Sequence, residues 1–90
     1  MATIRIPTPL RPYVQDNEHV SVSGSTVGEA LDDLVAQYPD LKPHLFNDGK
    51  LRSFVNVFLG EEDVRYLNGS ETAVTGDSKL LIIPSIAGGR

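Results

Sequence analysis

The sequence predicts an α+β fold in which one main helix covers one face of a mixed sheet of four to five strands. Three observations indicate this fold. One stretch carries apolar residues at helical spacing, several short stretches alternate between apolar and polar residues, and one late run is almost continuously apolar. Because only one amphipathic helix is available, a single sheet covered on one face fits these elements best.

Two short strands are expected near the N-terminus. Residues 3–6 and 19–23 each alternate between apolar and polar side chains, and Pro7 closes the first of these strands. Residues 7–12 are expected to form a loop, because their three prolines remove three backbone donors. The two strands are expected to pair as a hairpin across this long turn.

A helix over residues 27–38 is the clearest element. Thr26 and Glu29 form a capping-box pattern, in which a hydroxyl and a carboxylate accept hydrogen bonds from otherwise unpaired amides. Pro39 ends the helix. The opposite face is polar, so the helix is expected to pack on one side only. The apolar stripe consists of Val27, Ala30, Leu31, Leu34, Val35 and Tyr38.

The second half of the chain is expected to begin with a short extra turn at residues 41–46. Residues 54–59 are predicted to form a strong strand that ends at a turn beginning with Gly60. Residues 64–67 are predicted to form a short edge strand.

The last apolar run is expected to form the central strand of the sheet. Residues 79–83 are almost continuously apolar, which is typical of a strand in mid-sheet, and Pro84 ends the run. A central final strand parallel to the first strand would give the β-grasp, or ubiquitin-like, fold. We therefore expect one domain over residues 1–84, followed by a flexible tail at residues 85–90.

Composition argues against several classes of function. The chain has no cysteine, which excludes disulfides, thiolate metal sites and thiol catalysis. Its net charge of −4 argues against a nucleic-acid surface, and no apolar run approaches the roughly 20 residues of a membrane helix. Because the N-terminal residues lack a secretory pattern, we expect a cytoplasmic protein with no nucleic-acid or membrane partner.

The usual catalytic groups are nearly missing. His19 and His44 are the only histidines, and neither has the spacing of a metal ligand to another ligand type. The acidic residues at 32–33 and 61–63 are more typical of a solvated surface than of an acid–base pair in a pocket. We therefore expect no catalytic residue and no metal site within the chain itself.

The end of the chain is the remaining candidate. Residues 85–90 follow directly from the expected central strand and include the adjacent glycines Gly88 and Gly89. One interpretation is a frayed terminus. The other is a working tail, since six extended residues reach roughly 20 Å and glycine passes through a narrow channel. The position of the tail at the end of a rigid strand favours the second interpretation, in which the protein is itself the substrate.

Several segments resemble one known family when they are taken together. They are Phe-Val-Asn-Val-Phe-Leu at 54–59, Glu-Asp-Val-Arg-Tyr at 62–66, Gly-Asp at 76–77, and Ile-Ile-Pro-Ser-Ile-Ala-Gly-Gly at 82–89. In this combination they resemble the MoaD/ThiS family of ubiquitin-like sulfur carriers. The opening at residues 6–12, together with Tyr38-Pro39, is similar to the CysO branch. The resemblance covers nearly the whole chain.

The resemblance implies a carrier that is not an enzyme and binds no cofactor. An adenylyltransferase of the MoeB/ThiF type would use ATP and Mg²⁺ to adenylate the carboxylate of Gly89, with Ile86, Ala87 and Gly88 threaded into that partner. A sulfur donor would then displace AMP and leave a thiocarboxylate. The acceptor would be a pyridoxal-phosphate cysteine synthase or, if the chain is a molybdopterin synthase small subunit, the large subunit of that enzyme.

The chain departs from the family pattern at its last residue. It ends in Gly89-Arg90, whereas the active form of the family ends in Gly-Gly. We therefore predict that Arg90 must be removed before activation, and a metalloprotease is the expected agent. The alternative is that Arg90 does not belong to the native chain.

The strand at residues 54–59 offers a candidate docking surface. Alternation places Val55 and Val57 opposite Phe54 and Phe58. If the valines face the helix, both phenylalanines lie on the open face, where an exposed aromatic patch would dock the adenylyltransferase. If they do not, both phenylalanines belong to the core.

Two other classes of function stay open at this point. In one, the chain is a protein modifier that Gly89 links to target lysines. In the other, it is a plain ubiquitin-like binding domain with an idle tail.

Overall fold

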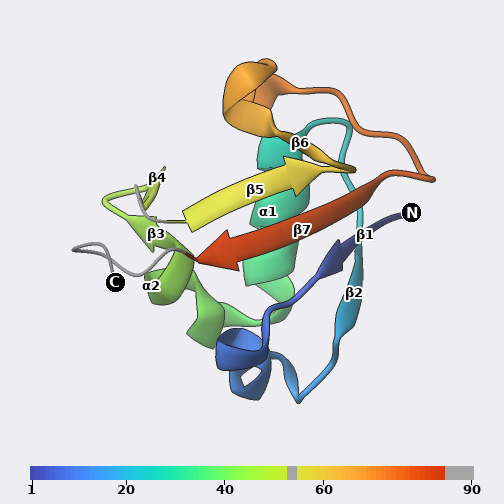
Figure 1. Ribbon diagram of the computed structural model, residues 1–90. Helices are drawn as coiled ribbons and strands as arrows, with labels where there is room; N and C mark the ends of the chain where they lie inside the picture. The colour runs from blue at the N-terminus through green and yellow to red at the C-terminus, as the bar shows by residue number, and fades with distance from the viewer. Residues whose placement is uncertain (53–54, 85–90) are drawn as a thin grey trace.

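The computed structural model describes residues 1–52 and 55–84, which form a five-stranded sheet with one main helix across one face (Figure 1). The strand order is β2-β1-β7-β5-β6. Strands β1 and β7 are parallel, and the other neighbours are antiparallel. The last strand is therefore central and parallel to the first, as predicted. The strands are β1 (Ala2–Arg5), β2 (His19–Val22), β5 (Val55–Leu59), β6 (Glu62–Asp63) and β7 (Lys79–Pro84).

The first two strands pair as the predicted hairpin, with Ile4 opposite Val20 and both side chains buried. The segment between them was expected to be a loop, and this expectation is wrong. It contains a 3₁₀ helix, η1 (Thr8–Val14), whose first turn is closed by a hydrogen bond from Leu10 N to Pro7 O of 2.9 Å. The fixed φ of proline suits such a helix, and a proline near its start sacrifices no bond.

Helix α1 (Val27–Gln37) confirms the predicted helix and its N-terminal cap. Thr26 Oγ1 accepts a hydrogen bond from Glu29 N at 3.2 Å, and Glu29 Oε1 accepts one from Ser25 N at 2.7 Å. The reciprocal bond therefore goes to Ser25, one residue earlier than in the usual capping box. The buried side of the helix consists of Val27, Ala30, Leu31 and Leu34.

The segment after α1 is more structured than expected. The predicted extra turn is present as η2 (Pro39–Leu41) and α2 (Lys42–Leu45), but a small hairpin of β3 (Phe46–Asn47) and β4 (Lys50–Leu51) follows it. Its turn contains Asp48 and Gly49, which have φ values of 54° and 78°. Asp-Gly is a favoured pair for such a two-residue turn, so the sequence did contain the signal for this hairpin.

The predicted edge strand at residues 64–67 is wrong. Asp63 Oδ1 accepts a hydrogen bond from Arg65 N at 2.9 Å, and this cap starts the 3₁₀ helix η3 (Val64–Tyr66). The edge strand is instead the two-residue β6 immediately before it. A further 3₁₀ helix, η4 (Gly69–Glu71), packs against α1.

The core lies between α1 and the sheet. Val57 of β5 is opposite Ile82 of β7, and both side chains are buried toward the helix. In the described part of the chain, no helix is both long enough and apolar enough to cross a membrane.

Candidate functional site

The histidines and acidic side chains of the described residues form no cluster that could bind a metal ion. Residues 1–52 and 55–84 contain no group of three or more histidine or acidic side chains placed to hold a metal. His19 lies on β2, whereas His44 lies on α2 and stacks on Tyr13 with ring centroids 4.1 Å apart. Asp33 accepts hydrogen bonds from Ser23 N and Gln37 Nε2, both at 3.0 Å, so its role is structural.

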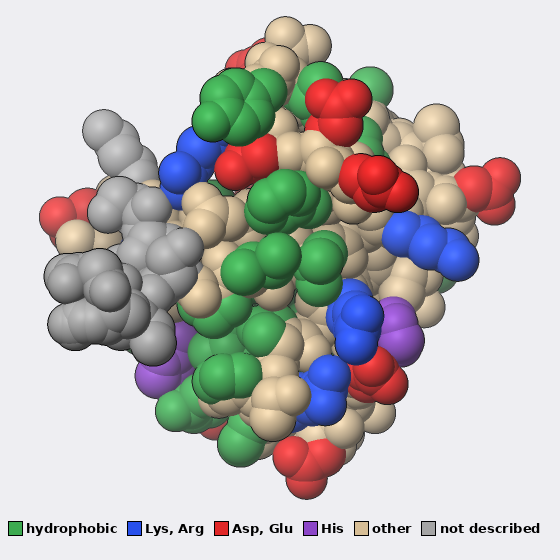
Figure 2. Space-filling model, viewed as in Figure 1, with side chains coloured by type: hydrophobic (Ala, Val, Ile, Leu, Met, Phe, Trp, Pro, Cys, Tyr) green, Lys and Arg blue, Asp and Glu red, His purple; other side chains and the backbone are tan. Residues whose placement is uncertain are grey.

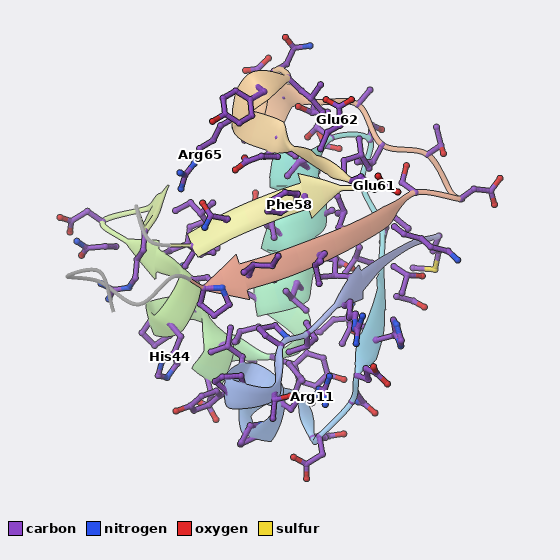
Figure 3. All side chains as sticks on the ribbon, in the orientation of Figure 1. Arg11, His44, Phe58, Glu61, Glu62 and Arg65 are labelled. Atoms are coloured by element: carbon purple, nitrogen blue, oxygen red, sulfur yellow. The ribbon has the colours of Figure 1, made fainter. Side chains whose placement is uncertain are left out.

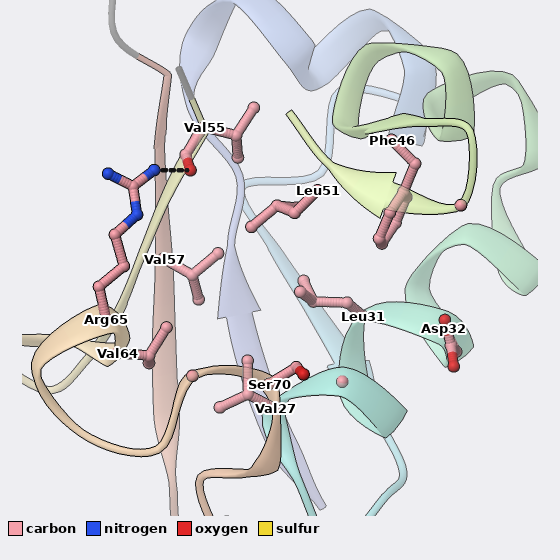
Figure 4. Close-up of a pocket in the computed structure, with 13 residues that line it drawn as sticks. Val27, Leu31, Asp32, Phe46, Leu51, Val55, Val57, Val64, Arg65 and Ser70 are labelled. Atoms are coloured by element: carbon pink, nitrogen blue, oxygen red, sulfur yellow. Dashed lines mark hydrogen bonds between the residues drawn. The ribbon is translucent and has the colours of Figure 1, made fainter. Parts of the chain in front are cut away.

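A pocket of about 460 Å³ lies between α1, the β3–β4 hairpin and β5 (Figure 4). Its volume is in the range of small-molecule sites. Its lining is mainly apolar, however, and Asp32, Arg65 and Ser70 are the polar side chains among its lining residues. This set has no nucleophile–base pair, so the pocket does not indicate a reaction.

The predicted tail residues Ile86, Ala87, Gly88, Gly89 and Arg90 lie outside the described residues. The structure does describe the point from which the tail continues, the C-terminal end of β7. Pro84 is the last residue of this strand and is opposite Val55, the first residue of β5. We call this pair of residues the tail root.

Pro84 was expected to end the strand, and it is the last residue that the structure assigns to β7. Gly60 N donates to Lys79 O at 3.0 Å, so these two residues form a hydrogen-bonded pair of the antiparallel ladder. Such pairs alternate with pairs that exchange no hydrogen bond, and the register makes Val55 and Pro84 one of the latter. The missing N–H of proline therefore costs no bond to β5.

The polar backbone groups of Val55 are satisfied by two arginines. Val55 N donates to Arg52 O at 3.0 Å, and Arg65 Nη2 donates to Val55 O at 3.0 Å (Figure 4). These groups point away from β7 toward the outer edge of β5. Strand β6 pairs only with Phe58 and Leu59, so it does not cover that edge. Among residues 1–52 and 55–84, no strand pairs with this part of the outer edge of β5, and Arg65 supplies a donor to its backbone there.

The open face of the sheet carries an apolar patch. Cross-strand pairing puts Phe58 beside Leu81, and Ile83 projects from the same face. Phe58 and Leu81 are half-buried, and Ile83 is 40% exposed. Figure 2 shows hydrophobic side chains gathered over the middle of this face. We call Phe58, Leu81 and Ile83 the open-face patch.

The predicted division of β5 between two faces is confirmed where the structure describes it. The side chains of Val55 and Val57 face the helix and are each only 1% exposed to solvent. Phe58 lies on the open face of the sheet. Phe54, the other predicted docking residue, lies outside the described residues.

Charged groups are unevenly placed around this face. Glu61 and Glu62 lie at the β5–β6 turn, at the opposite end of β5 from the tail root, whereas Arg65 lies beside the tail root (Figure 3). The sequence pattern assigns Arg65 no role, because the position of its side chain depends on a contact made only in the folded chain.

A mixed sheet with one face covered by a helix, and with its first and last strands parallel and adjacent, defines a ubiquitin-like β-grasp protein. The chain belongs to the ThiS family, whose model matches residues 4–89.

Individual relatives agree with this assignment. The chain is 40% identical over 90 residues to the sulfur carrier protein CysO of Mycobacterium tuberculosis strain H37Rv, with 97% of each chain covered. Its structure is similar to a chain in the crystal structure of the Amycolatopsis orientalis BexX/CysO complex, with a TM-score of 0.89 at 37% identity over 99% of this chain and 100% of that one. The solution structure of small archaeal modifier protein 1 from Methanosarcina acetivorans gives a TM-score of 0.88 at 25% identity, with 98% and 95% covered.

Proposed function

We propose that the chain is a sulfur carrier whose residue Gly89 becomes a thiocarboxylate and donates sulfur in biosynthesis, most directly that of cysteine. The observation that carries this proposal is the 40% identity to a sulfur carrier protein across 97% of both chains. In this role the chain is a substrate of other enzymes and has no catalytic residue of its own.

The chemistry explains why a tail suffices. A carboxylate resists nucleophiles, so the Gly89 oxygen first attacks the α-phosphate of ATP and releases pyrophosphate. A sulfur donor then attacks the acyl carbon, and AMP leaves. A thiocarboxylic acid ionises more readily than a cysteine thiol, whose reference pKa is about 8.5, so the carried sulfur is anionic at neutral pH. ATP and Mg²⁺ belong to the partner adenylyltransferase of the MoeB/ThiF type.

Arg90 is proposed to be removed before activation, by a metalloprotease. With Arg90 present, the terminal carboxylate belongs to Arg90 and lies one residue beyond Gly89. The residue to be activated would then have a bulky, positively charged side chain. The family match ends at residue 89, one residue before the end of this chain, which supports Gly89 as the working terminus.

The open-face patch is proposed to dock the adenylyltransferase. Its support is the partial exposure of Phe58, Leu81 and Ile83 on a sheet face that leads directly to the tail root. Exposed apolar patches of this kind usually mark protein interfaces.

The test uses chains ending at Gly89, Arg90 and Ala87. Each is incubated with ATP, Mg²⁺, a sulfur source and the MoeB/ThiF-type enzyme of the same cell, and is then weighed as an intact protein. Only the Gly89 form is expected to exchange one oxygen for sulfur. If the Gly89 form yields no AMP, or if the Arg90 form is thiocarboxylated on Arg90 itself, the proposal is wrong.

The acceptor is tested separately with the thiocarboxylate form. Transfer to a pyridoxal-phosphate cysteine synthase, with release of cysteine, is the expected result. Transfer to the molybdopterin synthase large subunit would replace this part of the proposal.

A second candidate function is protein modification. It is favoured by the similarity to small archaeal modifier protein 1, and it needs the same activated acyl group. In this case a target lysine attacks Gly89 and an isopeptide bond forms. Immunoblots of native cells would show conjugates of higher mass, which a carrier alone does not produce.

A further inference from the structure

Strand β2 forms one edge of the five-stranded sheet (Figure 1), because β1 is its single strand neighbour in the described part of the chain. Ile6 N donates to Glu18 O at 2.8 Å, so these two residues form a hydrogen-bonded pair of the antiparallel β1–β2 ladder. Bonded pairs occur at every second residue. The backbone groups of Ser21 and Ser23 therefore point away from β1, toward the outer edge of the sheet.

Two side chains of α1 occupy this outer edge. Gln37 Nε2 donates to Ser21 O at 2.9 Å, and Asp33 Oδ2 accepts a hydrogen bond from Ser23 N at 3.0 Å. Gln37 Nε2 also donates to Asp33 Oδ2 at 3.0 Å, which links the two side chains. The helix thus supplies one donor and one acceptor at the places where another strand would supply them. We call Asp33 and Gln37 the edge guard.

The spacing of residues in the two elements explains this fit. Asp33 and Gln37 are four residues apart, which is a rise of about 6.0 Å along a helix. Ser21 and Ser23 are two residues apart, which is about 6.6 Å along a strand. Because these two distances nearly match, polar side chains one helical turn apart meet alternate residues of the strand beside the helix. The contact therefore follows the edge and is not confined to one point.

We propose that the edge guard prevents β2 from pairing with β2 of a second copy of this chain. An open edge strand is a ready template for another strand, and a second copy always carries the same edge. Antiparallel pairing between two copies would need backbone groups that α1 occupies, Ser21 O and Ser23 N. This inference goes beyond the proposed function, since it concerns the association of the domain with itself and is independent of what the tail carries.

The test is a double variant, Asp33→Ala with Gln37→Ala, whose weight-average mass is measured by sedimentation over a wide range of concentration. We expect this mass to rise with concentration by up to about twofold, as two copies pair. The unsubstituted chain should keep the mass of one copy. Asp32→Ala is the matched control, because it removes the same charge from α1 at a residue that lines the pocket beside β5. It should also keep the mass of one copy.

Two further measurements connect the association with the edge of β2. Amide hydrogen exchange at Ser21 should slow as the concentration of the double variant rises, because its N–H gains a partner strand. Asp33→Asn should stay at the mass of one copy, since an amide oxygen still accepts a hydrogen bond from Ser23 N. If the double variant loses the native NMR spectrum of the domain, Gln37→Ala alone takes its place with the same expectations.

Three results would overturn the inference. In the first, the folded variant that lacks the guard keeps the mass of one copy at every concentration. In the second, the unsubstituted chain, Asp32→Ala or Asp33→Asn associates as strongly as that variant. In the third, the variant associates but amide exchange at Ser21 does not change.

Discussion

At the scale of single residues, Gly24 shows how closely the chain passes over the first turn of α1. Its φ is +142°, and a Cβ at this position would lie 2.8 Å from Glu29 Cβ and 2.9 Å from Ala30 N. Glu29 is held by both capping bonds, so it cannot move aside without breaking them. Glycine is therefore required here by contact as well as by conformation.

Gly24→Ala is expected to lower the free energy of unfolding by about 3 kcal/mol, as the sum of backbone strain and overpacking. Gly60→Ala is the matched control, because Gly60 also has a positive φ, +64°, but nothing lies within 4 Å of a Cβ built there. Gly60→Ala should lower the free energy of unfolding by about 1 kcal/mol. Equal losses in urea denaturation would show that the contact with α1 does not matter.

At the scale of elements, one face of β5 packs into the core, and the other carries part of the surface that is proposed to dock the partner. Val57 is 1% exposed and faces the helix, whereas Phe58 is half-buried and belongs to the open-face patch. Neighbouring residues of one strand are therefore expected to have different roles, and substituting each in turn tests this expectation directly.

Val57→Ala is expected to lower the free energy of unfolding by about 2 kcal/mol, because two buried methyl groups are lost. It should leave the KM for adenylation unchanged. Phe58→Ala should raise that KM while the melting temperature stays close to that of the unsubstituted chain. A large loss of stability in Phe58→Ala would instead place this ring in the core.

At the scale of the whole molecule, the ion pairs around Glu18 add little to the stability that the apolar core supplies. The Arg5–Glu18 pair has side-chain exposures of 54% and 50%, and Arg11–Glu18 has 27% and 50%. Ion pairs this exposed are screened by water and contribute little.

Glu18→Gln is therefore expected to change the free energy of unfolding by less than about 1 kcal/mol. The measurement is chemical denaturation at low and high salt. A loss well above this value, removed by salt, would show that the two pairs act as a stabilising network.

The long elements could be predicted because their side-chain pattern records burial directly. The apolar stripe that includes Leu31 and Leu34 predicted the helix, and the apolar run at residues 79–83 predicted the central strand. That run is apolar for two reasons, however. Leu80 and Ile82 are buried by the helix, whereas Leu81 and Ile83 contribute to the open-face patch.

Some short elements, such as η3, could not be predicted, because single contacts decide them. The side chain of Asp63 caps η3 with one hydrogen bond and so starts this short helix. The spacing of apolar residues in the sequence gives no sign of such a bond. The candidate site divides in the same way. Alternation separates Phe58 from Val55 and Val57 but does not say which set faces the helix, and the tail residues lie outside the described part of the chain. The bond from Arg65 to Val55 O depends on a contact made only in the folded chain.

The central position of β7 has a mechanical consequence. A force applied to the tail is transmitted along β7, which is hydrogen-bonded to β1 on one side and to β5 on the other. These bonds run across the direction of pulling, so they must break together and cannot open one at a time. An enzyme can therefore draw the chain end into a tight channel under tension while the domain stays intact.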